Sequence, residues 1–405
     1  MARLPLLKVR GTDIVDETGR PVHLKGVALG GWLLMEGYMF CGRLIPERTF
    51  REEFEKARGR EALAEFTRAF RDTFIQESDI RTIKEWGANC VRVPFNYRLV
   101  EFEDRPFSLN EEGLGYLDRV VEWCEKYGLY CILDMHAAPG GQNPDWHADC
   151  ASPEFFSNSF NIDRYLRLWY FLADRYSGST AVAGYDVLNE PVVKLHEERL
   201  IKDVYEKVTK EIRNADTKHI IFLEGNNWAQ RLGFLGTPKD RNTAYSVHMY
   251  APSDYVFNWE IDLAYPGKVY NMMWDKKTLE SIAEPYKDFI DMHKVPLYVG
   301  EFGINWRGGH YGELQWVRDV VEIFDKHRFH WTYWTYKTVA NATYPDGIYR
   351  YLKNAPWIDR HGPVTGWENF PRLWQKDKKH IIASWKTDNF ILNERLFSVL
   401  RNRFK

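Results

Sequence analysis

Residues 182–191 read VAGYDVLNEP, a nearly unbroken apolar run that ends in an amide, a carboxylate and a proline. A run of this kind is typical of a strand buried on both faces, as in a parallel sheet covered by helices. Pro191 has no N–H to donate to a neighbouring strand, so the strand is expected to stop at Glu190. The segment therefore predicts a buried strand whose carboxyl end is polar.

Seven other runs share this pattern, and longer stretches separate them. The eight candidate strands cover residues 24–29, 88–95, 129–136, 182–190, 219–225, 243–250, 296–303 and 330–337. The stretches between them include amphipathic segments with the period of a helix at 73–86, 114–127, 161–176, 196–214 and 312–327. Eight strand–helix units in succession predict an α/β fold, a closed (β/α)8 or TIM barrel.

The rest of the chain is expected to surround this barrel. No internal repeat, low-complexity tract or linker rich in Pro, Gly and Ser divides the sequence, so residues 1–405 are expected to form a single domain. Residues 8–23, with DETGRP at their centre, predict a hairpin that caps the barrel floor. The expected parts are the N-terminal hairpin at 1–23, the barrel at 24–340, and a long loop plus closing helix at 341–405, with the helix inside 381–400.

Composition and charge exclude several classes of partner. The chain has 405 residues, and its 55 Lys and Arg nearly balance 57 Asp and Glu. This balance gives no overall attraction to nucleic acid or to an anionic membrane, and no apolar run is long enough to span a bilayer. The N-terminus lacks the apolar core of a signal peptide, so a cytoplasmic location is expected unless a signal has been removed. Oligomeric partners stay open.

Polar side chains gather at the carboxyl ends of the candidate strands. They are Arg92, His136, Asn189, Glu190, His248, Tyr250, Glu301 and Trp334. One polar residue in a strand can equally be part of a structural ion pair, but that explanation does not account for so many of them. Because barrel active sites are assembled at this end from several strands, we expect an active site there.

Glu190 and Glu301 form the pair that indicates a reaction. They end the fourth and seventh candidate strands, so their side chains can converge across the barrel mouth. Two carboxyls about 5–5.5 Å apart suit cleavage of an acetal with retention of configuration, in which one donates a proton and the other attacks the anomeric carbon. An arginine such as Arg92 beside one carboxyl keeps it ionised, which makes the pair asymmetric.

Metal catalysis is an alternative because His136, His147 and His248 lie at or after strand ends. The sequence has no H-x-H or H-E-x-x-H spacing and no cluster of acidic ligands, so neither a metal nor another cofactor is expected. The glycine pairs at 30–31 and 140–141 lack the context of a phosphate-binding loop, and they are expected to permit tight turns.

Several segments together carry a resemblance to a known family. They are KGVALGGWLLME at 25–36, LDMHAAPGGQN at 133–143, LNEP at 188–191, HMY at 248–250, GEFG at 300–303 and YWTYK at 333–337. In this order, over about residues 22–340, the chain resembles glycoside hydrolase family 5, a clan A family of retaining (β/α)8 enzymes. The first two segments look most like its exo-β-1,3-glucanase branch. GEFG and the PDWHADC segment at 144–150 depart from that branch.

The resemblance implies roles for the residues around the carboxylate pair. Glu190 would be the acid/base and Glu301 the nucleophile. Asn189 would hydrogen-bond the sugar 2-hydroxyl, a contact that strengthens in the transition state. Arg92 would orient and ionise Glu301, and Tyr250 would hydrogen-bond it.

The resemblance also implies which residues bind the sugar. His136 and His248 would line the subsite whose glycosidic bond breaks, and Trp334 would form its hydrophobic floor. Glu36 would bind sugar hydroxyls at the blind end of the site. The alternative for Glu36 is a solvated carboxylate in a loop.

Long loops rich in aromatic rings follow several strands, at about 30–72, 137–160, 251–283 and 338–372. Their rings are Trp32, Tyr38, Phe40, Trp146, Trp259, Trp274, Tyr344, Trp357 and Trp367. A ring can stack on the C–H face of a sugar, although each one alone is more readily explained by packing in a core or lid. Together they predict a walled pocket rather than an open groove.

The expected function is a retaining β-glycoside hydrolase that acts on β-glucosidic linkages of short glucans, oligosaccharides or glucosides from the non-reducing end. An endo-β-1,4-glucanase, a β-mannosidase or mannanase, and a glycosidase of lipid-linked glucosides stay open within the family. A silent carbohydrate-binding barrel is the non-enzymatic alternative. Such a protein would be expected to have lost a carboxylate, Asn189 or Arg92, and all of these are present.

Overall fold

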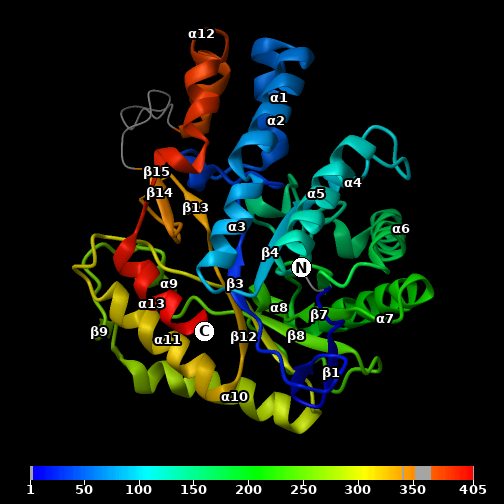
Figure 1. Ribbon diagram of the computed structural model, residues 1–405, viewed down its shortest axis with the longest axis vertical. Coiled ribbons are helices and arrows are strands. Elements are labelled where there is room, and N and C mark those ends of the chain that lie inside the picture. The colour runs from blue at the N-terminus through cyan, green and yellow to red at the C-terminus, as the bar shows by residue number, and fades with distance from the viewer. Residues whose placement is uncertain (1–2, 340–341, 352–365, 405) are drawn as a thin grey trace.

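Eight parallel strands close into a barrel in the order β11-β12-β3-β4-β5-β6-β7-β8 (Figure 1). The computed structural model describes residues 3–339, 342–351 and 366–404. The barrel strands are β3 Lys25–Ala28, β4 Cys90–Asn96, β5 Tyr130–Ala137, β6 Val182–Asp186, β7 Ile220–Glu224, β8 Thr243–His248, β11 Leu297–Phe302 and β12 His330–Tyr333. Each falls on one of the eight predicted runs, so the predicted TIM barrel is confirmed.

The N-terminal hairpin covers the barrel floor as predicted. Its antiparallel strands are β1 Lys8–Arg10 and β2 Asp13–Val15. Leu7 and Ile14 pack into a buried cluster with the first residues of several barrel strands. The Val9 N–H donates to Asn242 Oδ1 at 2.8 Å, just before β8. The hairpin therefore closes the end of the barrel opposite the polar strand ends.

Helices cover the outside of the barrel (Figure 1). The five predicted helical segments correspond to α3 Glu77–Glu85, α5 Glu111–Tyr127, α6 Ser159–Tyr176, α7 Glu198–Ala215 and α11 Glu313–His327. Further elements of this layer and of its loops are α4 Tyr97–Val100, α8 Asn226–Ala229, α9 Ser253–Val256, α10 Lys276–His293 and α13 Glu394–Phe404. In the described part of the chain, no helix is long and apolar enough to span a bilayer.

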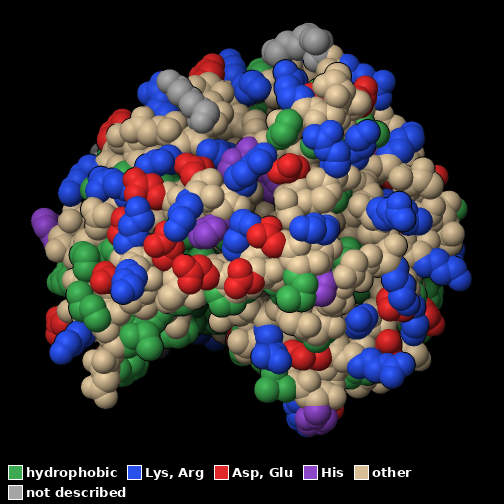
Figure 2. All heavy atoms as spheres, turned by 90° about the horizontal axis from the view of Figure 1, so that it is seen from below, with side chains coloured by type: hydrophobic (Ala, Val, Ile, Leu, Met, Phe, Trp, Pro, Cys, Tyr) green, Lys and Arg blue, Asp and Glu red, His purple; other side chains and the backbone are tan. Residues whose placement is uncertain are grey.

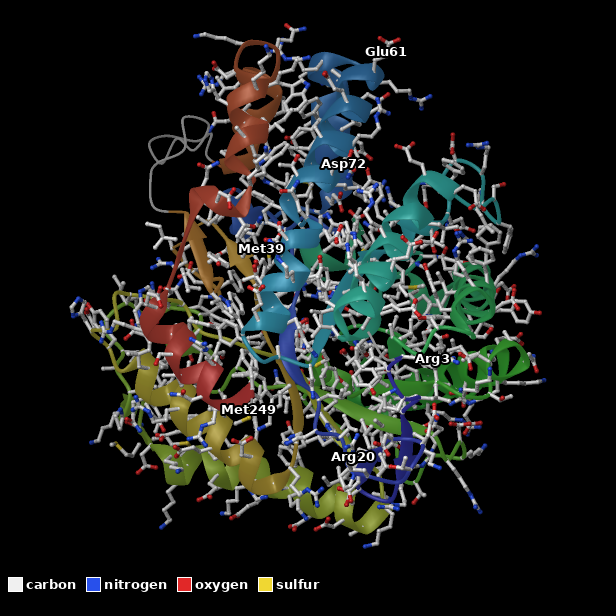
Figure 3. All side chains as sticks on the ribbon, in the orientation of Figure 1. Arg3, Arg20, Met39, Glu61, Asp72 and Met249 are labelled. Carbon is white, nitrogen blue, oxygen red and sulfur yellow. The ribbon has the colours of Figure 1, made fainter. Side chains whose placement is uncertain are left out.

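The segment at 30–72 is mostly helical, so the prediction that it is a loop is wrong. It contains α1 Glu47–Arg58 and α2 Arg60–Phe74, which pack against α12 Asn369–Ser384. These three helices, called the helical arm below, project from the barrel (Figure 1). Figure 3 shows Glu61 at the tip of the arm and Met39 at its base. Phenylalanines recur every four residues along α1 and α2, which gives each helix one apolar face.

The helical arm has an aromatic core of its own. The Phe50 and Trp367 rings stack with centroids 4.5 Å apart and planes at 5°. The Phe40 ring also lies nearly parallel to that of Trp367, with ring centroids 6.4 Å apart. Both Phe40 and Trp367 are fully buried here. The expectation that these two rings wall a ligand pocket is therefore wrong.

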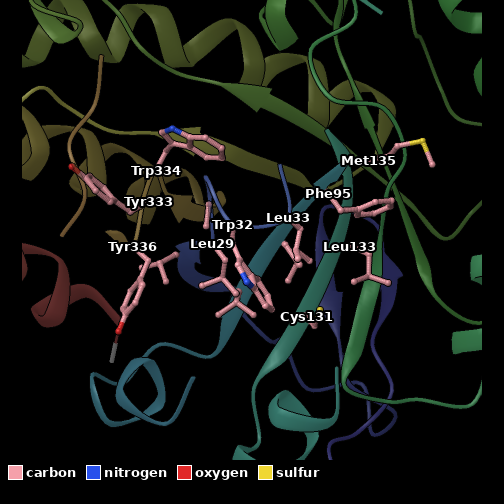
Figure 4. Close-up of a cluster of buried hydrophobic side chains, with 14 of the residues drawn as sticks. Leu29, Trp32, Leu33, Phe95, Cys131, Leu133, Met135, Tyr333, Trp334 and Tyr336 are labelled. Atoms are coloured by element: carbon pink, nitrogen blue, oxygen red, sulfur yellow. The ribbon is translucent and has the colours of Figure 1, made fainter. Parts of the chain in front are cut away.

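Trp32 is also a packing residue rather than a pocket wall. Its ring stacks on Trp123 at a centroid distance of 6.3 Å, and its Nε1 donates to the Arg71 carbonyl at 2.8 Å. Figure 4 shows Trp32 beside Leu29 and apart from Trp334. A tryptophan that follows a barrel strand can thus point to the helix layer as readily as to the barrel mouth.

The C-terminal part differs from the predicted long loop plus closing helix at 341–405. It has two helices, α12 and α13, joined through β15 Phe390–Leu392, which pairs with β14 Tyr349–Tyr351. The single helix predicted within 381–400 is interrupted after Ser384. There the buried Lys337 ammonium donates to the Phe74 carbonyl, and also to Trp385 O and Thr387 Oγ1, both at 2.9 Å. A continuous helix would use the Trp385 carbonyl internally.

Phe50→Ala should destabilise the protein because it removes the ring stacked on Trp367. A large cavity in a close-packed aromatic core costs about 3–5 kcal/mol in the free energy of unfolding. Chemical denaturation of both proteins measures this difference. Tyr170→Ala on α6, where the side chain is 43% exposed, is the control and should change stability by less than about 1 kcal/mol. Equal losses in the two variants would contradict the proposed arm core.

Candidate active site

The nine residues singled out in the sequence all lie at the carboxyl end of the barrel. They are carried by β4 (Arg92), β5 (His136), the turn after β6 (Asn189 and Glu190), β8 (His248), the segment after β8 (Tyr250), β11 (Glu301), the turn after β12 (Trp334) and the loop after β3 (Glu36). Seven of them line one cavity of about 900 Å³. The other two, Arg92 and Asn189, are fully buried and hydrogen-bond residues that line it. The structure therefore brings the predicted site together.

Arg92 lies among four buried carboxyl groups. Its Nε donates to Asp186 Oδ2 at 3.0 Å, and its Nη1 donates to Glu301 Oε1 at 2.6 Å. Its Nη2 lies 3.1 Å from both Asp134 Oδ2 and Glu224 Oε1. One cation cannot balance four buried negative charges, so some of these acids must hold protons.

The pKa values in this cluster separate the acids into two kinds. Burial, aided by the nearby Glu224, raises the pKa of Asp134 to about 8 and that of Asp186 well above its ordinary value. Burial also acts to raise the pKa of Glu224, but His248 and Arg92 outweigh it and lower that pKa. Burial therefore favours the protonated form of Asp134 and Asp186, whereas His248 and Arg92 favour the ionised form of Glu224.

Glu301 is held at both of its oxygens. Arg92 binds Oε1, and the Tyr250 hydroxyl donates to Oε2 at 2.8 Å. One oxygen of Glu301, one oxygen of Glu190 and a ring nitrogen of His248 all lie within 4.8 Å of one another. This closeness fits the gap of about 5–5.5 Å between the carboxyls of retaining glycosidases, not the gap of about 6.5–9.5 Å in inverting ones.

The backbone of Glu190 adopts a conformation that its surroundings must hold. Its φ is 47°, in the left-handed region that residues with a side chain rarely occupy. The Glu190 N–H donates to Glu224 Oε2 at 2.6 Å, and its carbonyl accepts from Asn143 Nδ2 at 2.9 Å. These two bonds fix the turn after β6 so that the Glu190 side chain lines the cavity.

Two imidazoles flank the Glu190 carboxyl. His248 Nδ1 lies 2.6 Å from Oε1, and His147 Nε2 lies 3.1 Å from Oε2. Burial acts to raise the pKa of Glu190, but the two histidines outweigh it and hold this pKa well below its ordinary value. Burial acts to lower the pKa of His147, but Glu190 and Glu36 outweigh it and raise it to about 9. At neutral pH a proton is therefore stored on His147, next to the carboxyl.

His136 and Trp334 lie face to face beside the carboxyl pair, with ring centroids 5.4 Å apart and planes at 7°. His136 Nδ1 bonds Asp134 Oδ2 at 2.7 Å, and Asn189 Nδ2 lies 3.4 Å from His136 Nε2. Burial lowers the pKa of His136 to about 3, so its ring is neutral. Gly30 makes room for the indole, because a Cβ there would lie 2.9 Å from the Trp334 ring.

Glu36 lies where three loops meet over one end of the cavity. Its Oε2 accepts from Trp146 Nε1 at 3.2 Å, while its buried Oε1 has no hydrogen-bond partner among the described residues. Burial raises the pKa of Glu36 to about 8. Trp146 packs edge-on against Tyr344 at 5.1 Å, and Tyr344 packs on Tyr38 at 5.3 Å. The loops after β3, β5 and β12 thus close this end.

The predicted aromatic walls are partly confirmed. Five of the nine rings line the cavity: Tyr38, Trp146, Trp259, Trp274 and Tyr344. Trp32, Phe40 and Trp367 pack elsewhere, as described above, and Trp357 lies outside the described residues. Trp228 and Phe257 also line the cavity, although the sequence did not single them out.

Four buried site residues were not predicted to act here. Asp134, Asp186 and Glu224 lie within apolar strand runs, where a single acid is the available signal. The sequence suggests His147 only as a possible metal ligand. It lies in the PDWHADC segment, which departs from the pattern of the exo-β-1,3-glucanase branch. Its contact with Glu190 depends on the shape of that loop, which strand patterning does not reveal.

Glu190, His248 and Glu301 could together offer three ligand atoms to a metal ion. These atoms already bond to one another and to Arg92 and Tyr250. The guanidinium at 2.6 Å from Glu301 would also repel a cation. The arrangement therefore suits proton transfer and nucleophilic attack better than metal binding.

Comparison with known proteins agrees with this chemistry. The sequence model for Cellulase (glycosyl hydrolase family 5) matches residues 55–339. A Beta-xylosidase of Phanerodontia chrysosporium is 36% identical over 82% of this chain and 71% of its own length. Endoglucanase C of Acetivibrio thermocellus is 30% identical over 69% of this chain and 89% of its own length. Endoglucanase Cel5A of Thermotoga maritima shares the fold, with 19% identity, a TM-score of 0.63, and coverage of 93% of this chain and 96% of its own.

The family match covers well over half of the chain, and it includes the strands that carry both carboxylates. It confirms the resemblance seen in the motifs around Glu190 and Glu301. The chain therefore belongs to glycoside hydrolase family 5, and it is a retaining β-glycoside hydrolase with a carbohydrate substrate.

Proposed function

We propose that this enzyme is exo-acting and releases a terminal β-linked sugar, glucose foremost, from short oligosaccharides or glucosides. The observation that carries the proposal is the closed end of the cavity, where Trp146, Tyr344 and Tyr38 meet beside Glu36. A polysaccharide bound in mid-chain would need a groove open at both ends. At the closed end, Glu36 Oε1 can accept a hydrogen bond from a sugar hydroxyl.

In the first step, Glu301 acts as the nucleophile. Arg92 binds one oxygen of its carboxyl group, and Tyr250 fixes the second oxygen. Attack on the anomeric carbon breaks the glycosidic C–O bond, while the leaving oxygen takes a proton from Glu190. The product of this step is a covalent glycosyl-enzyme and a free aglycone.

In the second step, Glu190 acts as a base. Water attacks the anomeric carbon from the side that the aglycone left, and it gives its proton to Glu190. The bond between the sugar and Glu301 breaks, and the sugar leaves with its original configuration. The neutral His136 lines the sugar side of this reaction and can bind the sugar hydroxyls, and Asn189 lies directly behind it.

His147 supports both proton transfers at Glu190. Since Glu190 and Glu36 raise the pKa of His147 to about 9, the imidazole keeps a proton at neutral pH, 3.1 Å from Glu190 Oε2. When Nε2 has given up that proton, it can accept from Asn143 Nδ2 at 2.9 Å instead. Each protonation state of His147 thus has a partner, so the ring can pass a proton to Glu190 and take it back.

Variants of the two carboxylates test their roles. Glu301→Gln should abolish turnover of all substrates, because no nucleophile remains. Glu190→Ala should lower kcat/KM for an alkyl glucoside by about 10²–10⁴-fold but spare a dinitrophenyl glucoside, whose leaving group needs little protonation. Glu85→Gln, at an exposed acid of α3, is the control and should keep full activity. Equal loss on both substrates in Glu190→Ala would contradict the acid/base assignment.

The pH dependence of kcat/KM tests the role of His147. In the wild type the Glu190–His147 pair keeps its last proton up to the His147 pKa of about 9. His147→Asn removes this store, so the alkaline limb of the profile should move to lower pH. His196→Asn, at an exposed histidine, is the matched control and should leave the limb in place. An unchanged or upward-shifted limb in His147→Asn would refute the proton store.

Product analysis tests exo action and sugar preference. Terminally labelled laminari- and cello-oligosaccharides should lose one sugar at a time from the non-reducing end. Aryl β-glucoside, β-xyloside and β-mannoside should be compared in the same assay, because a relative bears the name Beta-xylosidase. Cuts in the middle of a polymer at early times would instead support the endo-acting alternative, in line with the name Endoglucanase C.

A further inference from the structure

Exposed apolar side chains are concentrated on one short segment next to the cavity mouth. Tyr270 is 73% exposed and Met272 is 56% exposed, and three more large apolar residues of the same segment are also exposed. These five residues, called the apolar lip below, are Trp259, Ile261, Tyr270, Met272 and Met273. Figure 2 shows hydrophobic side chains gathered beside a hollow at the lower edge of the view. Exposure of this much apolar surface in one place usually marks a binding site.

The apolar lip is held in its exposed position by the fold. Its core is a hairpin of β9 Gly267–Val269 and β10 Met272–Trp274. Val269 is buried beneath the hairpin. The Tyr265 hydroxyl donates to Asp319 Oδ2 on α11 at 2.7 Å, and Thr278 Oγ1 donates to the Met273 carbonyl at 2.8 Å. The hairpin is thus attached to the helix layer on both sides, while its tip faces solvent.

The apolar lip is continuous with the site of bond cleavage. Tyr270, Met272 and Trp259 line the same cavity as Glu190, and Ile282 and Tyr286 of α10 extend its wall. This wall lies in the loop after β8, whereas Glu36 lies in the loop after β3, at the closed end. A glycoside whose sugar fills the closed end would therefore direct its aglycone along this wall.

Two polar groups of this wall already bond within the protein. The Tyr286 hydroxyl donates to the Gln230 carbonyl at 2.7 Å, and Trp228 Nε1 donates to Asp145 Oδ2 at 2.6 Å. A second sugar here would present several hydroxyls, each needing a hydrogen-bond partner. A hydrocarbon chain needs none, and it would bury the exposed faces of Tyr270 and Met272.

We propose that the aglycone of the preferred substrate is an extended apolar group of the alkyl-chain kind, bound along the apolar lip. The inference rests on the proposed function, since Glu190 must protonate the oxygen that joins sugar and aglycone. Glu260 and Asp262 lie within the same segment. With Lys268 they leave the segment with a net negative charge, which disfavours an anionic membrane surface as the occupant.

A series of n-alkyl β-glucosides from ethyl to octyl, used below their micelle concentrations, tests the proposal. Their alcohol leaving groups are nearly equal in acidity, so differences in kcat/KM report binding of the chain. Burial of a methylene is worth up to about fourfold in affinity, and burial of half of each methylene gives about twofold. We expect kcat/KM to rise by about 60-fold from ethyl to octyl glucoside, and to exceed the value for cellobiose.

Variants of the hairpin tip locate the effect. The double variant Tyr270→Ser/Met272→Ser should reduce the octyl-to-ethyl ratio of kcat/KM to below about fivefold. Met292→Ser on α10 is the matched control, because Met292 is 75% exposed and does not line the cavity. The control should keep the wild-type ratio and the wild-type rate on ethyl glucoside. Circular dichroism of each variant checks that the fold is retained.

The outcomes separate this inference from the proposed function. If the wild type hydrolyses ethyl glucoside but shows no rise with chain length, or prefers cellobiose to octyl glucoside, the apolar aglycone is overturned and the glycosidase stands. If ethyl glucoside, octyl glucoside and the aryl glycosides are all left unhydrolysed, the proposed function itself fails. If the wild type is a dimer in light scattering and the double variant is a monomer, the lip is a subunit interface and the inference is overturned.

Discussion

The guanidinium of Arg92 is the shared counter-ion of acids from four strands: Asp134 on β5, Asp186 on β6, Glu224 on β7 and Glu301 on β11. A buried cation without these acids, or the acids without the cation, would cost several kcal/mol. This charge therefore stabilises the packing of these acids at the carboxyl ends of their strands. The same side chain thus both joins these strand ends and holds Glu301, the proposed nucleophile.

The two carboxyls proposed to be catalytic share one cavity and the neighbour His248, but their other neighbours differ. Glu301 faces a permanent cation and a phenol, neither of which exchanges a proton at neutral pH. Glu190 faces two imidazoles, which do. This difference in neighbours, more than the depth of burial, fits the roles proposed for Glu301 as nucleophile and for Glu190 as acid and base. Glu224 links the two halves, since it bonds both Arg92 and the Glu190 backbone.

The sequence predicts the barrel well because a strand buried on both faces must be apolar along its whole length, whatever its partners are. It predicts the polar strand ends for the same reason, since Arg92 and Glu301 stand out in apolar runs. Contacts made by loops are a different matter. His147 meets Glu190 only through the path of the loop after β5, and Lys337 interrupts a helical pattern about fifty residues away. Neither contact leaves a local periodic signal. In the sequence, the aromatic residues of the helical arm cannot be told apart from aromatic residues that line a pocket.

The helical arm packs together helices that are synthesised at very different times. Its helices α1 and α2 are complete by residue 74, but α12, which covers their aromatic faces, begins at Asn369. At about 5–20 residues per second, a ribosome takes on the order of 15–60 s to make the intervening chain. During that time Phe50, Phe54, Phe66 and Phe70 have no permanent cover. Until α12 is made, the nascent protein therefore exposes an amphipathic helical hairpin, and this adds a risk of association with other chains to the risk from the unclosed barrel.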